Sequence, residues 1–299
     1  MPRAKANGIE LEYDSFGRAS DAPLLLIMGL GAQMLLWDEE FCEALAARGH
    51  YVVRFDNRDV GLSTKFDHKG VPNVLAMMQP GADRSAAPYT LDDMADDAAG
   101  LLGALRIERA HIVGASMGGM IAQTVAYRHA PKTRSLVSIM SSTGNPALPP
   151  AKPEAMAVLL TPRALDRASN VEASALASKV IGSPGYPQDE ARIRARAGMM
   201  FDRAFTPFGT ARQMAAIFAH GSRVSRLAAV TAPTLVIHGL ADPLVPVEGG
   251  RDTAKSIPGA QLLEIEGMGH DLPPGLWTRI ADAIAAHTKK AEAAQGVKR

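Results

Sequence analysis

Residues 114–118 read Gly-Ala-Ser-Met-Gly, and they join an apolar run typical of a buried strand, residues 111–113, to a helical run at 120–130. A sharp strand-to-helix turn holds a serine in a strained backbone conformation and exposes its hydroxyl above the sheet. Neighbouring chains crowd the positions two before and two after that serine, which suits glycine. The pattern predicts that Ser116 is a nucleophile. The alternative is a glycine-rich connection without chemistry.

A serine hydroxyl becomes a good nucleophile only when a base removes its proton and a carboxylate orients that base. Where the nucleophile stands on this kind of turn, the order along the chain is nucleophile, acid, histidine. Asp242 follows the apolar run 234–238, and His270 follows the run 261–265. Both residues therefore lie where strands end, at the edge of the sheet that displays the serine. We predict that Asp242 is the acid and His270 the base.

Other residues of the right types are less well placed. The second position where an acid could stand, after residues 136–140, holds only hydroxyl side chains at 141–143. Asp271 is expected to be a solvated surface carboxylate. The other histidines are less well placed to act as the base. His50 and His68 precede the serine, and His238 ends a strand. His220 lies in the cap region described below, and the remaining three lie at or inside regular elements: His111, His129 and His287.

Acyl transfer also requires two backbone N–H groups at the position where negative charge develops on the carbonyl oxygen. Met117, directly after the serine, is expected to supply one of them. Leu30, in the glycine-flanked turn that follows residues 24–28, is expected to supply the other. The glycines of that turn also suit an ordinary tight turn, and the two interpretations are compatible.

These positions require a sheet with its strands side by side, and the rest of the chain predicts one. Apolar runs of strand length alternate with helical segments, which indicates βαβ units and a mostly parallel sheet covered on both faces. The expected strands are residues 9–16, 24–28, 51–55, 111–113, 136–140, 234–238 and 261–265, and the expected helices are 37–48, 91–105, 121–129 and 276–289. The predicted fold class is α/β.

The alternation stops after residue 144, where four prolines precede short Ala- and Met-rich helical segments. We predict that residues 145–226 form a helical cap over the ends of the strands, inserted into a core made of 1–144 and 227–299. The irregular segment 68–88 is expected to be a loop beside the same cleft. The apolar residues of the cap are of types found either in a packed core or in the lining of a pocket. They are Met156, Met199, Met200, Phe201, Phe205, Phe208, Met214 and Phe218.

Composition excludes several other classes of protein. The 299 residues include 32 basic and 31 acidic side chains, a net charge of +1, so no strong field attracts nucleic acid or an anionic membrane. The one cysteine, Cys42, excludes an intramolecular disulfide framework and is expected to be buried. No His, Cys or Asp cluster has metal-ligand spacing. Without a signal-peptide core or an apolar run of about 20 residues, the protein is expected to be cytoplasmic. The sequence leaves open whether it forms a homo-oligomer.

Several motifs together resemble the α/β-hydrolase superfamily, and within it the aclacinomycin methylesterase-like serine esterases. Besides the serine turn, they are Met-Gly-Leu-Gly at 28–31, Asp-Asn-Arg-Asp-Val-Gly-Leu-Ser at 56–63, Pro-Thr-Leu-Val-Ile at 233–237 and Gly-Met-Gly-His at 267–270. In the second of these, Arg58 and Asp59 are expected to pair locally and to have a structural role. The resemblance covers about residues 9–144 and 227–287 and does not extend convincingly into the cap.

The resemblance implies a carboxylesterase-type hydrolase that uses a Ser-His-Asp triad and needs no cofactor. By position, the resemblance implies that Ser116 is the nucleophile, Asp242 the acid and His270 the base. It also implies that Leu30 and Met117 are the oxyanion donors. The expected reaction is hydrolysis, through an acyl-enzyme, of small to medium, largely apolar esters. Alternatives on the same residues are a cofactor-free perhydrolase or haloperoxidase-like enzyme and a hydrolase of C–C bonds or lactones. An alternative of another class is a small-molecule receptor without catalysis.

Overall fold

The structure is a computed structural model that describes residues 1–79, 81–162, 164–294 and 296. An eight-stranded sheet runs through it in the order β1-β2-β4-β3-β5-β6-β7-β8. All neighbouring strands from β4 to β8 are parallel, and the first two strands are antiparallel to their partners. The strands are β1 (Arg3–Ala6), β2 (Ile9–Phe16), β3 (Ala22–Ile27), β4 (His50–Phe55), β5 (Ala110–Ala115), β6 (Thr133–Ile139), β7 (Thr234–Gly239) and β8 (Gln261–Ile265).

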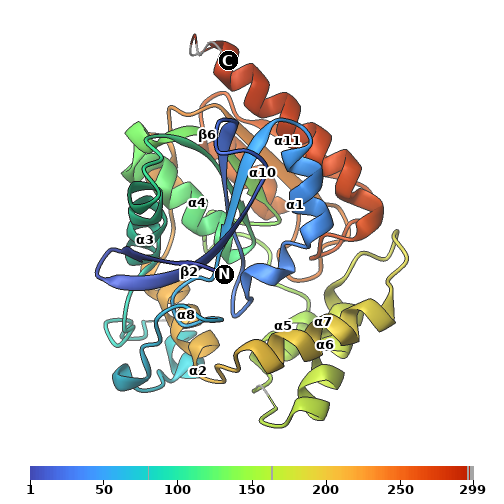
Figure 1. Cartoon of the computed structure of the whole chain (residues 1–299). Helices are drawn as coiled ribbons and strands as arrows, with labels where there is room; N and C mark the ends of the chain where they lie inside the picture. Colours follow the sequence, from blue (N-terminus) through green and yellow to red (C-terminus); the bar gives the residue numbers. More distant parts are fainter. Residues whose placement is uncertain (80, 163, 295, 297–299) are drawn as a thin grey trace.

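Helices cover both faces of the sheet, with α3 and α4 on one side and α1 and α11 on the other (Figure 1). A further helix, α10, packs near β7. The bounds of the five helices are α1 (Glu39–Ala46), α3 (Leu91–Ala104), α4 (Met117–Arg128), α10 (Glu248–Ser256) and α11 (Pro274–Ala294). Alternate residues of β3 point to opposite faces. Leu25 and Ile27 join the cluster with α3 and α4, whereas Leu24 and Leu26 join the cluster with α1 and α11. This double burial explains why the central strands are continuously apolar, and the predicted α/β class is confirmed.

Two elements of the core were not predicted from the sequence. The strand β1 is short, lies at the edge of the sheet and contains two charged residues, so it has no apolar run. The helix α10 contains two buried glycines and, apart from them, one apolar residue, Ala254. Helix α11 also continues to Ala294, beyond the expected end near residue 289. No helix in the described part of the chain is both long and apolar enough to cross a bilayer.

The region after residue 144 is helical, and no strand lies among its described residues up to 226. Its helices are α5 (Pro153–Leu160), α6 (Arg167–Ile181), α7 (Glu190–Arg203), α8 (Gly209–His220) and the short α9 (Val224–Leu227). Helices α5, α6 and α7 lie together at one end of the molecule, apart from the helices that flank the sheet (Figure 1). We propose that residues 145–226 act as a cap on the core formed by 1–144 and 227–299, as the sequence predicts.

The segment 68–88 contains the short helix α2 (Val74–Met77), which packs against α8. The remaining short elements of the described chain are 3₁₀ turns: η1 (Met34–Leu36), η2 (Asp67–Lys69) and η3 (Ala130–Lys132). The first of them follows the turn after β3 and leads the chain toward α1.

Candidate active site

Ser116 lies between the last residue of β5 and the first residue of α4. Its backbone has φ +57° and ψ −123°, a conformation that costs an L-residue free energy and that the surrounding structure must enforce. The two flanking glycines make this turn possible. A Cβ on Gly114 would lie 2.0 Å from the carbonyl oxygen of Gly118, and a Cβ on Gly118 would lie 2.0 Å from that of Ile27. The strained strand-to-helix turn is therefore present as predicted.

Replacing Gly118 with alanine is expected to destabilise the protein. The new methyl group would collide with backbone atoms of β3, which cannot move without disrupting the central sheet, so the free energy of unfolding should fall by about 3 kcal/mol. Urea unfolding followed by circular dichroism measures this change. Gly103→Ala is the matched control, because nothing lies within 4 Å of a Cβ at that exposed position of α3. An equal effect of the two substitutions would contradict the packing argument.

Ser116, His270 and Asp242 come from three different strand ends and form a continuous line of contacts. The Oγ atom of Ser116 lies 2.9 Å from Nε2 of His270, and Nδ1 of His270 lies 2.8 Å from Oδ2 of Asp242. Asp242 is only 6% exposed, and His270 is also largely buried. An imidazole in this position can accept the serine proton through Nε2 while the carboxylate holds its Nδ1–H.

The carboxylate of Asp242 is held in the ionised form. Its Oδ1 accepts hydrogen bonds from the backbone N–H groups of Leu244 (2.9 Å) and Val245 (2.8 Å). Burial favours the neutral acid, but the attraction of His270, the interactions with His238 and the backbone bonds outweigh it. Together they keep the pKa of the Asp242 carboxyl well below its ordinary value. An ionised acid is what the orientation of a histidine base requires.

The turn after β3 lies directly beside the serine. A Cβ on Gly29 would approach the Cβ of Ser116 to 3.1 Å, so only glycine allows this distance without displacement. Asn57 donates from its side-chain amide to the carbonyl oxygen of Met28 at 2.8 Å and fixes the start of the turn. Within the described residues, the backbone N–H groups of Leu30 and Met117 donate to no acceptor. Both donors are therefore available to a ligand beside Ser116.

The loop that carries His270 is held by the last residue of α6 and by the segment that follows it, contacts that the sequence did not predict. The N–H of His270 donates to the carbonyl oxygen of Ile181 at 2.7 Å. The N–H of Gly269 donates to Oγ of Ser183 at 2.9 Å, and the same hydroxyl donates to Asp271. Asp271 is thus half-buried, and burial raises the pKa of its carboxyl. The expectation of a solvated surface carboxylate at this position was wrong.

A pocket of about 370 Å³ opens beside Ser116 and His270. The core contributes the turn after β3 and the loop that carries His270 to its lining, and α6 and α7 contribute many of the other lining residues. Among the apolar cap residues singled out from the sequence, Met200, Phe201 and Phe205 line this pocket, while Met199 and Phe208 are about half exposed to solvent. The lining includes no described residue of the segment 68–88, so the prediction that this segment borders the cleft was wrong.

The prediction that Arg58 and Asp59 of the segment 56–63 pair locally was wrong, because both form ion pairs with distant residues. Arg58 forms a buried ion pair with Asp97 of α3 at 2.6 Å, and Asp59 forms one with Arg212 of α8 at 2.8 Å. These two pairs join the segment to different layers of the molecule. The sequence gives no signal for such partners, because they lie 39 and 153 residues away along the chain.

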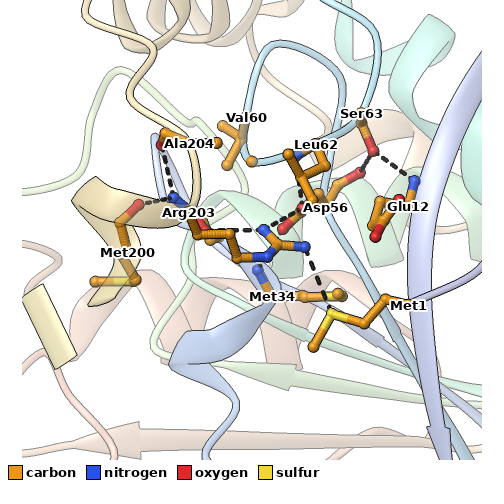
Figure 2. A network of polar contacts seen from close by, with 12 residues as sticks. Met1, Glu12, Met34, Asp56, Val60, Leu62, Ser63, Met200, Arg203 and Ala204 are labelled. Carbon is orange, nitrogen blue, oxygen red and sulfur yellow. Dashed lines mark hydrogen bonds and ion pairs between the residues drawn. The ribbon is translucent and has the colours of Figure 1, made fainter. Parts of the chain in front are cut away.

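A second polar network joins the same segment to the end of α7. Asp56, which is fully buried, accepts hydrogen bonds from the N–H groups of Met34 (2.8 Å) and Leu62 (2.9 Å). Figure 2 shows Arg203 reaching across to this carboxylate, with an Nη1–Oδ2 distance of 2.7 Å. The same guanidinium donates to Oε1 of Gln33 at 2.8 Å. The cap and the core are thus connected by charged groups as well as by apolar contacts.

Cys42 is buried, and burial raises the pKa of its thiol to about 12, which leaves it protonated and unreactive at neutral pH. In the part of the chain that the structure describes, no group of three or more His, Cys, Asp and Glu side chains is arranged to hold a metal ion.

Comparisons with known proteins agree with this architecture. The sequence model of the alpha/beta hydrolase fold family matches residues 22–273. Rhodomycin D methylesterase DauP of Streptomyces sp. (strain C5) is 31% identical to this chain, over 95% of the chain and 96% of the relative. Rhodomycin D methylesterase DnrP of Streptomyces peucetius is 30% identical with the same coverage. The structure of a meta-cleavage product hydrolase from Pseudomonas fluorescens IP01 superposes with a TM-score of 0.74 at 20% identity, covering 97% of this chain and 98% of that one.

Proposed function

This chain belongs to the α/β-hydrolase fold family, and from that premise we propose that it is a serine carboxylic-ester hydrolase acting through an acyl-enzyme. Its class, an esterase-type hydrolase, follows from the family together with the two methylesterase relatives that match almost its whole length. The observation that carries the proposed mechanism is the line of contacts from Ser116 through His270 to Asp242, at 2.9 Å and 2.8 Å.

In the proposed reaction, His270 accepts the proton of the Ser116 hydroxyl while the oxygen attacks the ester carbonyl carbon. The negative charge that develops on the carbonyl oxygen is stabilised by the backbone N–H groups of Leu30 and Met117. The tetrahedral intermediate then collapses, and the alcohol leaves with the proton from His270. In the second half, His270 takes a proton from water while the water oxygen attacks the carbonyl carbon of the acyl-enzyme. The bond to Oγ of Ser116 then breaks, His270 returns the proton to that oxygen, and the carboxylic acid is released. Asp242 holds the imidazole and stabilises its charged form in both halves.

The proposed substrates are small to medium esters that are largely apolar near the reacting carbonyl. The pocket volume of about 370 Å³ lies in the range of pockets that bind drug-sized ligands. Apolar side chains line the pocket, among them Met28 and Met140 from the core and Phe201 from the cap. Methionine adapts its shape to different ligands. The two methylesterase relatives suggest that a methyl ester is within this substrate class.

A series of p-nitrophenyl esters from acetate to laurate tests the proposal, together with labelling by a fluorophosphonate probe. We expect hydrolysis with an optimum at short to medium acyl chains, and mass spectrometry should locate the phosphonyl group on the peptide that contains Ser116. Labelling without ester turnover would favour the alternatives on the same residues, which peroxide-dependent bromination and lactone or diketone substrates would then distinguish. Absence of both turnover and labelling would contradict the proposal and favour a receptor.

A further inference from the structure

The turn that carries Leu30 is held by a side chain from the cap. The backbone N–H of Gly31 donates to Oε1 of Gln213, in α8, at 2.7 Å. The amide nitrogen of Gln213 donates in turn to the carbonyl oxygen of Arg58 at 2.8 Å. Gln213 is completely buried, and so is its bond to Arg58, whereas its bond to Gly31 lies at a half-buried position beside the pocket. The oxygen and the nitrogen of one amide thus both bind the core backbone, one at the turn that carries Leu30 and the other at Arg58.

The other contacts of this turn show which part of it depends on the cap. The start of the turn is fixed from the core, by the bond from Asn57 to the carbonyl oxygen of Met28. Its end is fixed by Gln33, whose side-chain amide donates to the carbonyl oxygens of Met200 (2.7 Å) and Ala204 (2.9 Å) at the end of α7. Arg203 supports this second anchor, because its guanidinium donates to Oε1 of Gln33 at 2.8 Å. Gln213 binds between the two, next to Leu30 itself.

The middle of the turn is also its most deformable part. Gly31 has φ +62°, and glycine changes between left-handed and right-handed backbone conformations at little cost. If the acceptor on Gln213 were removed, the N–H of Gly31 would lose this hydrogen bond at a half-buried position, which costs about as much as one hydrogen bond. The peptide would then rotate toward another acceptor and move the neighbouring N–H of Leu30.

We propose that Gln213 is a positioning residue that holds the Gly29–Gly31 turn so that the Leu30 N–H stays directed at the developing oxyanion. This inference rests on the proposed ester hydrolysis. Stabilisation of an oxyanion depends on donors that are already in place before the charge develops, so a side chain that fixes one donor acts on the transition state more than on the bound substrate.

The test compares three variants of the full-length protein on the best p-nitrophenyl ester. Gln213→Met keeps the size of the side chain and removes both hydrogen bonds. Gln213→Glu keeps an acceptor for Gly31 and, because a buried carboxyl tends to be protonated, also a donor for Arg58. Gln123→Met is the matched control, since Gln123 is an equally buried glutamine whose amide binds Ser138 and Arg223 and not the turn. We expect Gln213→Met to lower kcat by roughly 10- to 100-fold with little change in KM.

A transition-state mimic separates positioning from general loss of structure. A trifluoromethyl ketone adds to the serine and forms an oxyanion, whereas the ketone without fluorine binds mainly as an unreacted analogue. In Gln213→Met, the inhibition constant of the fluorinated ketone should rise by the same factor as kcat/KM falls, and that of the plain ketone should stay constant. Gln213→Glu should restore most of kcat/KM and most of the affinity for the fluorinated ketone. Gln123→Met should lower the melting temperature while kcat stays close to that of the unaltered protein.

The inference is overturned if Gln213→Met leaves kcat and the inhibition constant of the fluorinated ketone unchanged. It is also overturned if Gln123→Met loses as much activity as Gln213→Met, because the effect would then reflect stability alone. Failure of the proposed function has a different signature: the unaltered protein would neither hydrolyse esters nor react with a fluorophosphonate, and the role of Gln213 would fall with it.

Discussion

Ser116→Ala is expected to lower kcat by roughly 10⁶-fold, the size of effect that removal of the nucleophile has in a serine triad. The hydroxyl contacts Nε2 of His270 at 2.9 Å, and alanine removes the oxygen that this imidazole would activate. Alanine also keeps the backbone turn, so the melting temperature should change by less than about 2 °C. Initial rates on a p-nitrophenyl ester and a thermal scan provide the two measurements.

Ser141→Ala is the matched control for this substitution. Ser141 is buried beside the same turn, and its hydroxyl has no hydrogen-bond partner within the described structure. Ser141→Ala should change the rate of ester hydrolysis by less than about twofold, because the surrounding contacts of the turn are kept. If Ser116→Ala retained a substantial part of the activity, or if Ser141→Ala abolished it, the assignment of the nucleophile would be wrong.

The residues placed on strand ends were the ones that the sequence could predict. Ser116, Asp242 and His270 each follow an apolar run of strand length, and parallel strands bring their carboxyl ends to one edge of the sheet. Proximity in space then follows from topology alone, even though 154 residues separate Ser116 from His270. Hydrophobic periodicity carries the same kind of information for the sheet and its covering helices, which is why most of the core was predicted with boundaries close to those observed.

The parts that escaped prediction are held by single hydrogen bonds between distant segments. Nothing around Gln213 in the sequence distinguishes a glutamine that binds Gly31, 182 residues away, from one that faces solvent. The same is true of Ile181, whose carbonyl oxygen binds the N–H of His270. Asp271 was predicted to be exposed because charged residues usually are. Its burial comes from Ser183 in the cap, a contact that the local pattern does not encode.

Asp242→Asn is expected to lower kcat by about 10⁴-fold, although the two side chains have nearly the same shape. The Oδ1 position accepts two backbone N–H groups, from Leu244 and Val245, so the amide oxygen of asparagine must occupy it. The amide nitrogen is then left facing Nδ1 of His270, where the carboxylate oxygen stood at 2.8 Å. Two N–H donors cannot face each other, so the imidazole carries its proton on Nε2 instead. In that tautomer it cannot accept the proton of Ser116.

The same substitution changes how stability depends on pH. The pKa of the Asp242 carboxyl is lowered in the folded protein, so this group stabilises the fold at pH values above its ordinary pKa of about 3.9. That contribution is lost as the pH falls through the lowered folded-state pKa. Asparagine does not titrate, so the loss of stability between about pH 5 and pH 2 should be smaller in Asp242→Asn than in the unaltered protein. Urea unfolding across this range measures the difference.

Asp252→Asn is the control for both effects. This aspartate of α10 accepts hydrogen bonds from the side chains of Thr143 and Asn145 and has no contact with His270. It should leave kcat close to that of the unaltered protein. An Asp242→Asn variant with nearly full activity would show that no carboxylate is needed to orient His270. The strand-end position of Asp242 would then have a purely structural purpose, which is to anchor the loop through Leu244 and Val245.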